Sequence, residues 1–123
     1  MSKRVMIVDD ALFMRTMLRD IFESAGWQVV VEAETGTEAI DEYKIHQPDL
    51  VTMDIVMPEM GGIDALTKIL SEHPAARIVV CSALSQKDLI LEAINAGAKD
   101  FIVKPFQNAQ VLEVVERVVA GCS

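Results

Sequence analysis

Four apolar runs of strand length in this chain end abruptly in polar or charged side chains. These side chains are three carboxylates, one hydroxyl and one ammonium, from Asp9, Asp10, Asp54, Ser82 and Lys104. Pro58 follows the run that ends at Asp54 and prevents the strand from continuing. Because parallel strands end at one edge of their sheet, all five side chains would meet there. This edge is therefore the candidate functional site.

Carboxylates this close together repel one another unless a cation compensates them. Oxygen ligands in a partly hydrated cleft suit Mg²⁺, which takes one or two carboxylates and keeps several waters. A divalent ion beside a carboxylate, a lysine and a hydroxyl is the equipment for phosphoryl transfer, with a carboxylate as nucleophile. Asp54 is the best nucleophile because its strand is expected to be central. A simpler alternative is an acidic cluster neutralised by Lys104 alone, or carboxylates that only cap helices.

The elements that must position these residues alternate between strand and helix. Strands are expected near residues 5–8, 27–33, 50–54, 78–82 and 101–104, with a helical segment after each. Such alternation predicts a parallel sheet with helices on both faces. Five units are too few for an eight-stranded barrel, which favours an open, doubly wound α/β sheet of order 2-1-3-4-5. This order places the first and third strands side by side, and their carboxylates with them.

Two helices adjoin the expected site. In the segment 11–25 the apolar residues form one stripe, and Arg15 is expected to lie off it. After the fourth strand, Ser85 and Asp88 have the spacing of a helix cap and the third helical residue. The helix that follows is expected to turn Ile90, Ala93 and Ile94 inward.

The composition limits the classes of protein to consider. A chain of 123 residues fits one domain, and a net charge of −8 argues against nucleic acid or an anionic membrane as a main partner. The two cysteines, Cys81 and Cys122, are expected to be free thiols. The N-terminal sequence does not fit a signal peptide, and no apolar run has membrane-spanning length. We therefore expect a cytoplasmic protein.

Several motifs at the strand ends together resemble the receiver domains of response regulators, across essentially the whole chain. These motifs are Ile7-Val8-Asp9-Asp10, Met53-Asp54 with Met57-Pro58 and Gly62, Ser82-Ala83, Gly97-Ala98 and Lys104-Pro105-Phe106. The stretches 10–15 and 98–107 are similar to stand-alone chemotaxis regulators in particular. The resemblance implies one receiver domain over residues 1–123, with a flavodoxin-like (βα)5 three-layer sandwich. It also implies a two-component phospho-acceptor switch, not an enzyme with a separate substrate.

The resemblance assigns roles around the carboxylates. It implies that Asp54 accepts a phosphoryl group from a histidine of a sensor kinase, with Mg²⁺, or Mn²⁺ in its place, as cofactor. Asp10, Asp54 and the backbone carbonyl of Val56 would bind the metal directly. Asp9 would act largely through water.

The same resemblance assigns roles on the other side of Asp54. It implies that Ser82, Ala83 and Lys104 bind the phosphoryl group and that Phe101 then rotates inward. It also implies a cis bond between Lys104 and Pro105, which proline makes accessible. The output would be protein binding through the fourth helix, fifth strand and fifth helix. A flagellar motor switch protein is the expected target, and a phosphatase is a further expected partner.

The sequence departs from familiar receivers at three positions. Gly61 stands where an acidic or amide residue is common, which would loosen the loop after the site. Val56 and Leu84 lie two residues beyond Asp54 and Ser82, where many receivers are polar. Two apolar side chains there would hinder an attacking water, so slow self-dephosphorylation is expected.

Three other functions are alternatives to the switch. A haloacid-dehalogenase-like phosphatase needs a second acid two residues after the nucleophile, where this chain has Val56. A flavodoxin-like cofactor carrier needs a hydroxyl- and amide-rich loop after the first strand, where Asp9 and Asp10 would repel a phosphate. A receiver that serves a non-chemotactic phosphorelay, or one excised from a larger regulator, stays open.

Overall fold

A computed structural model describes residues 3–121 of the protein, except the side chain of Leu84. The chain forms one parallel five-stranded sheet of order β2-β1-β3-β4-β5, so the predicted topology is confirmed. Each β1–β3 and β3–β4 neighbour pair is in continuous register, and Val8 lies opposite Met53. The strands are β1 (Arg4–Val8), β2 (Gln28–Ala33), β3 (Leu50–Asp54), β4 (Ile78–Ala83) and β5 (Asp100–Lys104).

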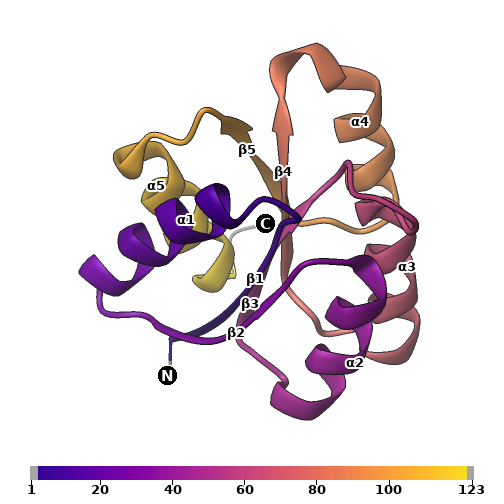
Figure 1. Ribbon diagram of the computed structural model, residues 1–123, viewed down its shortest axis with the longest axis horizontal. Helices are drawn as coiled ribbons and strands as arrows, with labels where there is room; N and C mark the ends of the chain where they lie inside the picture. Colours follow the sequence, from indigo (N-terminus) through magenta and orange to yellow (C-terminus); the bar gives the residue numbers. More distant parts are fainter. Residues whose placement is uncertain (1–2, 122–123) are drawn as a thin grey trace.

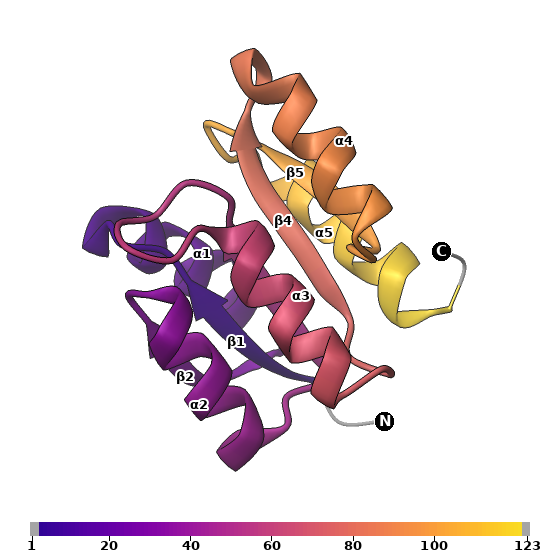
Figure 2. The ribbon, with the colours of Figure 1, turned by 90° about the vertical axis from the view of Figure 1, so that its right-hand side faces the viewer.

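Helices cover both faces of this sheet. Figure 1 shows α1 and α5 on one side and α2, α3 and α4 on the other, and Figure 2 looks onto the second group. A single 3-10 turn, η1 (Leu84–Gln86), joins β4 to α4. The helices are α1 (Leu12–Ser24), α2 (Gly36–His46), α3 (Gly62–Glu72), α4 (Lys87–Asn95) and α5 (Asn108–Val119). None of the helices formed by residues 3–121 combines the length and apolarity needed to cross a bilayer.

The core consists of two apolar layers, one on each face of the sheet. Along β1, Met6 and Val8 pack toward α2 and α3, whereas Val5 and Ile7 pack toward α1 and α5. All five residues of β3 are buried, because both faces of a central parallel strand are covered. Burial of one such aliphatic side chain contributes roughly 1.5–3 kcal/mol, so the ends of β1 and β3 are held firmly.

Two local predictions around α4 are wrong. Ser85 is not the cap of α4, because η1 intervenes and Gln86 is the residue before the helix. Ile94 does not face the core but is 37% exposed, while Ile90 and Ala93 are buried. Ile90 and Ala93, three residues apart, form the buried stripe of α4, and Ile94 lies at the edge of that stripe. Cys81 is buried with a free thiol, and Cys122 lies outside the described residues.

Candidate functional site

The three carboxylates of Asp9, Asp10 and Asp54 come together at the carboxyl edge of the sheet. Ligand oxygens from the three residues all lie within 4.8 Å of one another. The parallel register that pairs Val8 with Met53 sets Asp9, the next residue, beside Asp54. Asp9 and Asp54 are buried and Asp10 is exposed, so the cluster opens to solvent on one side.

Asp9 is held in place by its own backbone and by a lysine from the far strand. Its amide donates to the carbonyl of Ala33 at 3.1 Å, and its Oδ1 accepts from the amide of Ala11 at 2.9 Å. Its Oδ2 accepts from Nζ of Lys104 at 3.0 Å. The same ammonium lies 3.4 Å from Oδ1 of Asp54. Lys104 therefore bridges the two buried carboxylates from the end of β5.

This one lysine does not fully neutralise the site. Burial, and then the charge of Asp9, raises the pKa of Asp54 to about 6, although Lys104 and a hydrogen bond from the amide of Val56 act in the opposite direction. Burial alone would lower the pKa of Lys104, but the carboxylates of Asp54 and Asp9 more than offset it, and that pKa is raised. The site thus keeps an uncompensated negative charge at neutral pH.

The residues present fit a magnesium ion. Carboxylate oxygens are the hard ligands that Mg²⁺ prefers, and the exposed side of the cluster at Asp10 leaves room for the waters it retains. Three carboxylates outnumber the single lysine ammonium in this cluster, so a divalent cation would offset negative charge there. That the backbone carbonyl of Val56 also binds this ion stays a prediction.

The loop after Asp54 runs against the backbone of β3, and this requires a glycine. A Cβ on Gly62 would lie 2.1 Å from the carbonyl oxygen of Asp54 and 2.8 Å from Cα of Ile55. The amide of Gly62 donates to the carbonyl of Ile55 at 2.8 Å. At Gly61 a Cβ would meet only ordinary contact, 3.6 Å from the same carbonyl oxygen of Ile55. Gly62 is thus sterically obligatory, whereas Gly61 leaves space for a side chain.

Ser82, Ala83 and Lys104 lie at the carboxyl ends of β4 and β5, whereas Phe101 lies near the start of β5. Ser82 is fully buried, and its hydroxyl donates to Oε1 of Gln86 at 2.7 Å. The amide of Ala83 donates to the same oxygen at 3.0 Å. Phe101 is 37% exposed, and the peptide bond between Lys104 and Pro105 is cis.

The sequence predicts that the apolar side chains of Val56 and Leu84 slow self-dephosphorylation. Val56 is 51% exposed, at the rim beyond Asp54. The side chain of Leu84 lies outside the described part of the chain. Their effect on phosphoryl lifetime therefore stays a prediction.

Sequence reasoning missed Arg15, which is 6% exposed although it was expected to lie off the apolar stripe. Its Nη1 donates to the backbone carbonyl of Asp9 at 2.7 Å, and its Nε to Glu32 at 2.9 Å. A further bond of 3.3 Å runs to Glu34. Its spacing from the buried Leu18, three residues on, could have indicated its inward position.

This chain is similar to several known proteins. The model of the response regulator receiver domain family matches residues 5–116. Chemotaxis protein CheY of Thermotoga maritima is 58% identical over 118 residues, which cover 96% of this chain and 98% of that protein. CheY of Bacillus subtilis is 55% identical over 119 residues, covering 97% and 99%. A chain of the CheX-CheY-BeF3-Mg²⁺ complex of Borrelia burgdorferi superposes with a TM-score of 0.90 at 42% identity, covering 94% of this chain and 88% of that one.

Proposed function

The chain belongs to the family of response regulator receiver domains, and we propose that it is a phosphorylation-controlled switch in chemotaxis with Asp54 as phosphoryl acceptor. The observation that carries this proposal is the packing of Asp54 against Asp9, Asp10 and Lys104 at the end of the central strand. A sensor histidine kinase would be the phosphoryl donor. The chain would catalyse only its own phosphorylation and dephosphorylation.

In this proposal Asp10, Asp54 and the carbonyl of Val56 hold Mg²⁺, or Mn²⁺ in its place, and Asp9 contributes through water. The chemistry that the metal supplies when bound is neutralisation of charge on the carboxylates and on the transferring phosphoryl oxygens. Asp54 attacks phosphorus through a carboxylate oxygen, and the bond from phosphorus to the donor histidine breaks. Lys104, already 3.4 Å from Asp54, offers a cation to the new phosphoryl oxygens.

The switch would follow from new bonds made to the phosphoryl group. Ser82 and the amide of Ala83 would donate to it, and Phe101 would move inward from its half-exposed position. A coupling of about 1–3 kcal/mol between phosphorylation and partner binding changes partner affinity roughly 5–150-fold. Charge-assisted hydrogen bonds from Ser82 and Lys104 to the phosphoryl group are strong enough to supply this coupling free energy.

The output surface in this proposal is the face formed by α4, β5 and α5. An apolar groove of about 330 Å³ lies on it, lined by Lys87, Ile90, Leu91 and Phe101. Phe101 thus belongs to the groove and is also the ring proposed to move. A flagellar motor switch protein is the proposed target, a phosphatase is a further proposed partner, and the cytoplasm is the proposed compartment.

The decisive experiment is incubation with acetyl phosphate and Mg²⁺, followed by intact mass spectrometry. We expect the wild type to gain one phosphoryl group, with no gain in EDTA or in the Asp54→Asn variant. Equal labelling of that variant, or no labelling of the wild type, would refute the proposal. Capture of a purified flagellar switch protein by the phosphorylated form would then distinguish chemotaxis from another phosphorelay.

A further inference from the structure

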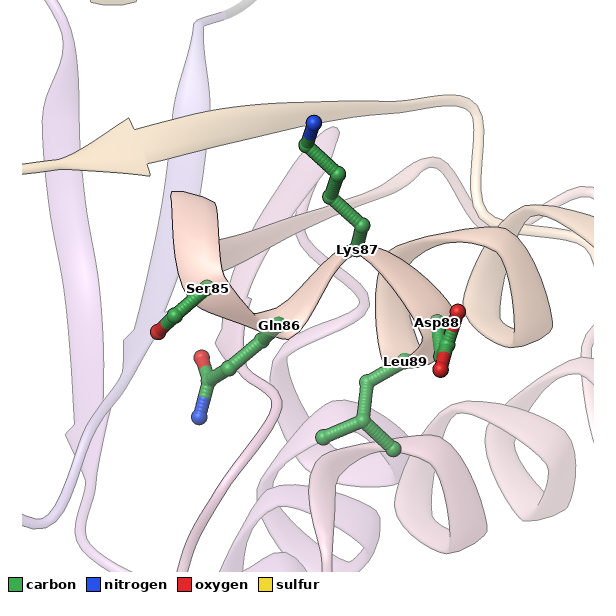
Figure 3. A pocket seen from close by; sticks show the side chains of 5 residues that line it. All are labelled: Ser85, Gln86, Lys87, Asp88 and Leu89. Atoms are coloured by element: carbon green, nitrogen blue, oxygen red, sulfur yellow. The ribbon is translucent and has the colours of Figure 1, made fainter.

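One side-chain oxygen in the turn after β4 accepts hydrogen bonds from two donors at once. Oε1 of Gln86 lies 2.7 Å from the hydroxyl of Ser82 and 3.0 Å from the amide of Ala83. Figure 3 shows Gln86 projecting from η1 on the side opposite to Lys87. The carboxamide therefore folds back from the start of α4 onto the end of β4.

These two donors are the ones that the proposed function assigns to the phosphoryl group. A carbonyl oxygen has two lone pairs and can accept both bonds, as one phosphoryl oxygen can. A single N–H or O–H, however, forms one good bond at a time. In the unphosphorylated structure the donors of Ser82 and Ala83 are already engaged by Gln86.

We propose that the carboxamide of Gln86 is an internal acceptor that competes with the phosphoryl group for Ser82 and Ala83. This inference rests on the proposed function and makes Gln86 a positioning residue, which acts through those two donors. Ser82 is fully buried, so its hydroxyl needs a protein partner, and in the resting state Gln86 is the nearer one. The carbonyl of Ala83, at 3.1 Å, is the weaker alternative acceptor.

The position of Gln86 couples this competition to α4. Gln86 is the last residue of η1 and directly precedes the helix. A pocket of about 470 Å³ beside the turn, lined by residues 85–89, gives the released side chain space to move into. Release of Gln86 would thus free the start of α4, the helix that carries Ile90 and Leu91 of the proposed output groove.

Removing the acceptor should favour the phosphorylated arrangement. The apparent affinity of a ligand falls with the fraction of protein that is competent to bind it, so weakening the resting state raises that affinity. For Gln86→Met, which keeps the length of the side chain and removes the acceptor, we expect BeF3⁻ to bind roughly threefold to tenfold more tightly. BeF3⁻ offers three acceptor fluorines where phosphoryl oxygens would be.

The experiment is a titration of the full chain with BeF3⁻ at saturating Mg²⁺, followed by ¹⁹F NMR. Gln110→Met is the matched control, because Gln110 is exposed on α5 and undergoes the same chemical change. Gln86→Ala serves as a second variant, and thermal melting shows that each protein is folded. In a Ser82→Ala background the gain from Gln86→Met should shrink, because one of the two competing donors is gone. A role of Gln86 in stability alone would not produce this dependence.

The outcomes separate the two levels of the proposal. If the wild type binds no BeF3⁻, the proposed function fails, and the competition fails with it. If the wild type binds but both folded Gln86 variants bind equally tightly or more weakly, the function stands and the role of Gln86 is overturned. A gain of the same size in Gln110→Met would also overturn it.

Discussion

Neutralising Asp54 should stabilise the metal-free protein. The ionised form of Asp54 is disfavoured in the fold by burial and by Asp9, which raise its pKa from 3.8 to about 6. This difference in pKa corresponds to a loss of roughly 3 kcal/mol in the free energy of unfolding once Asp54 is fully ionised. The Asp54→Asn variant has no such charge. We therefore expect it to be more stable than the wild type at pH 8, by up to roughly 3 kcal/mol or about 10 °C in melting temperature.

The sign of the pH dependence follows from the raised pKa. The folded wild type holds the Asp54 proton more tightly than the unfolded chain does, so this group's contribution to stability is complete below about pH 4. It is lost as the pH rises through 6. The advantage of Asp54→Asn should thus be largest at pH 8 and should vanish near pH 4.

Urea unfolding in EDTA at pH 8, 7, 6, 5 and 4 measures this advantage. Asp20→Asn is the control for loss of an exposed carboxylate and should show little change. Added Mg²⁺ should stabilise the wild type and narrow its gap to Asp54→Asn, since a ligand stabilises the form that binds it. If Asp54→Asn is less stable than the wild type at pH 8, or if its advantage does not vary with pH, the electrostatic reasoning is wrong.

Three further predictions concern other parts of the site. Gly62→Ala should cost at least about 2 kcal/mol in urea unfolding because its Cβ meets backbone, whereas Gly61→Ala should be nearly neutral. Arg15→Met should lower the free energy of unfolding by roughly 1–3 kcal/mol, and Arg19→Met should lower it by less than about 1 kcal/mol. Both arginines bind Glu32, but only Arg15 is buried. Equal losses in the two variants would contradict this reasoning. Val56→Asn should shorten the phosphoryl lifetime measured by intact mass, and an unchanged decay would remove Val56 as a timing residue.

The arrangement of the strand ends could be predicted from the sequence because it depends on one rule. Parallel strands end at one edge, so a polar residue that ends a buried apolar run is placed by topology alone. That rule brought Asp9, Asp54 and Lys104 together without any knowledge of side-chain contacts. Their proximity in the structure confirms the placement, while their roles in phosphoryl transfer stay proposals.

The residues that the sequence did not reveal depend on contacts between elements. Arg15 is polar, and its inward position makes sense only with Glu32 on β2, which pairs with its guanidinium. A buried charge of this kind is tolerated only when such a partner is present. Gln86 was hidden because the fourth helix was expected to start near Ser85, and the intervening turn sets the direction of its side chain.

The acceptor and the responding residues of this site differ in how freely they can move. Asp54 ends a strand that is buried on both faces, and shifting it would disturb two apolar layers. Its position is therefore nearly fixed, and added charge has to be met by groups that come to it.

Lys104 already lies beside Asp54, so its ion pairs need only redistribute. Ser82 and Ala83 instead donate two bonds to Gln86, each worth roughly 1 kcal/mol net, and these bonds must break before the donors can turn to a phosphoryl group. A phosphoryl group can outcompete bonds of that size, because hydrogen bonds to a charged acceptor are about twice as strong as neutral ones. The turn after β4 is consequently the part of this edge where phosphorylation can change the structure at least cost, and α4 starts immediately after it.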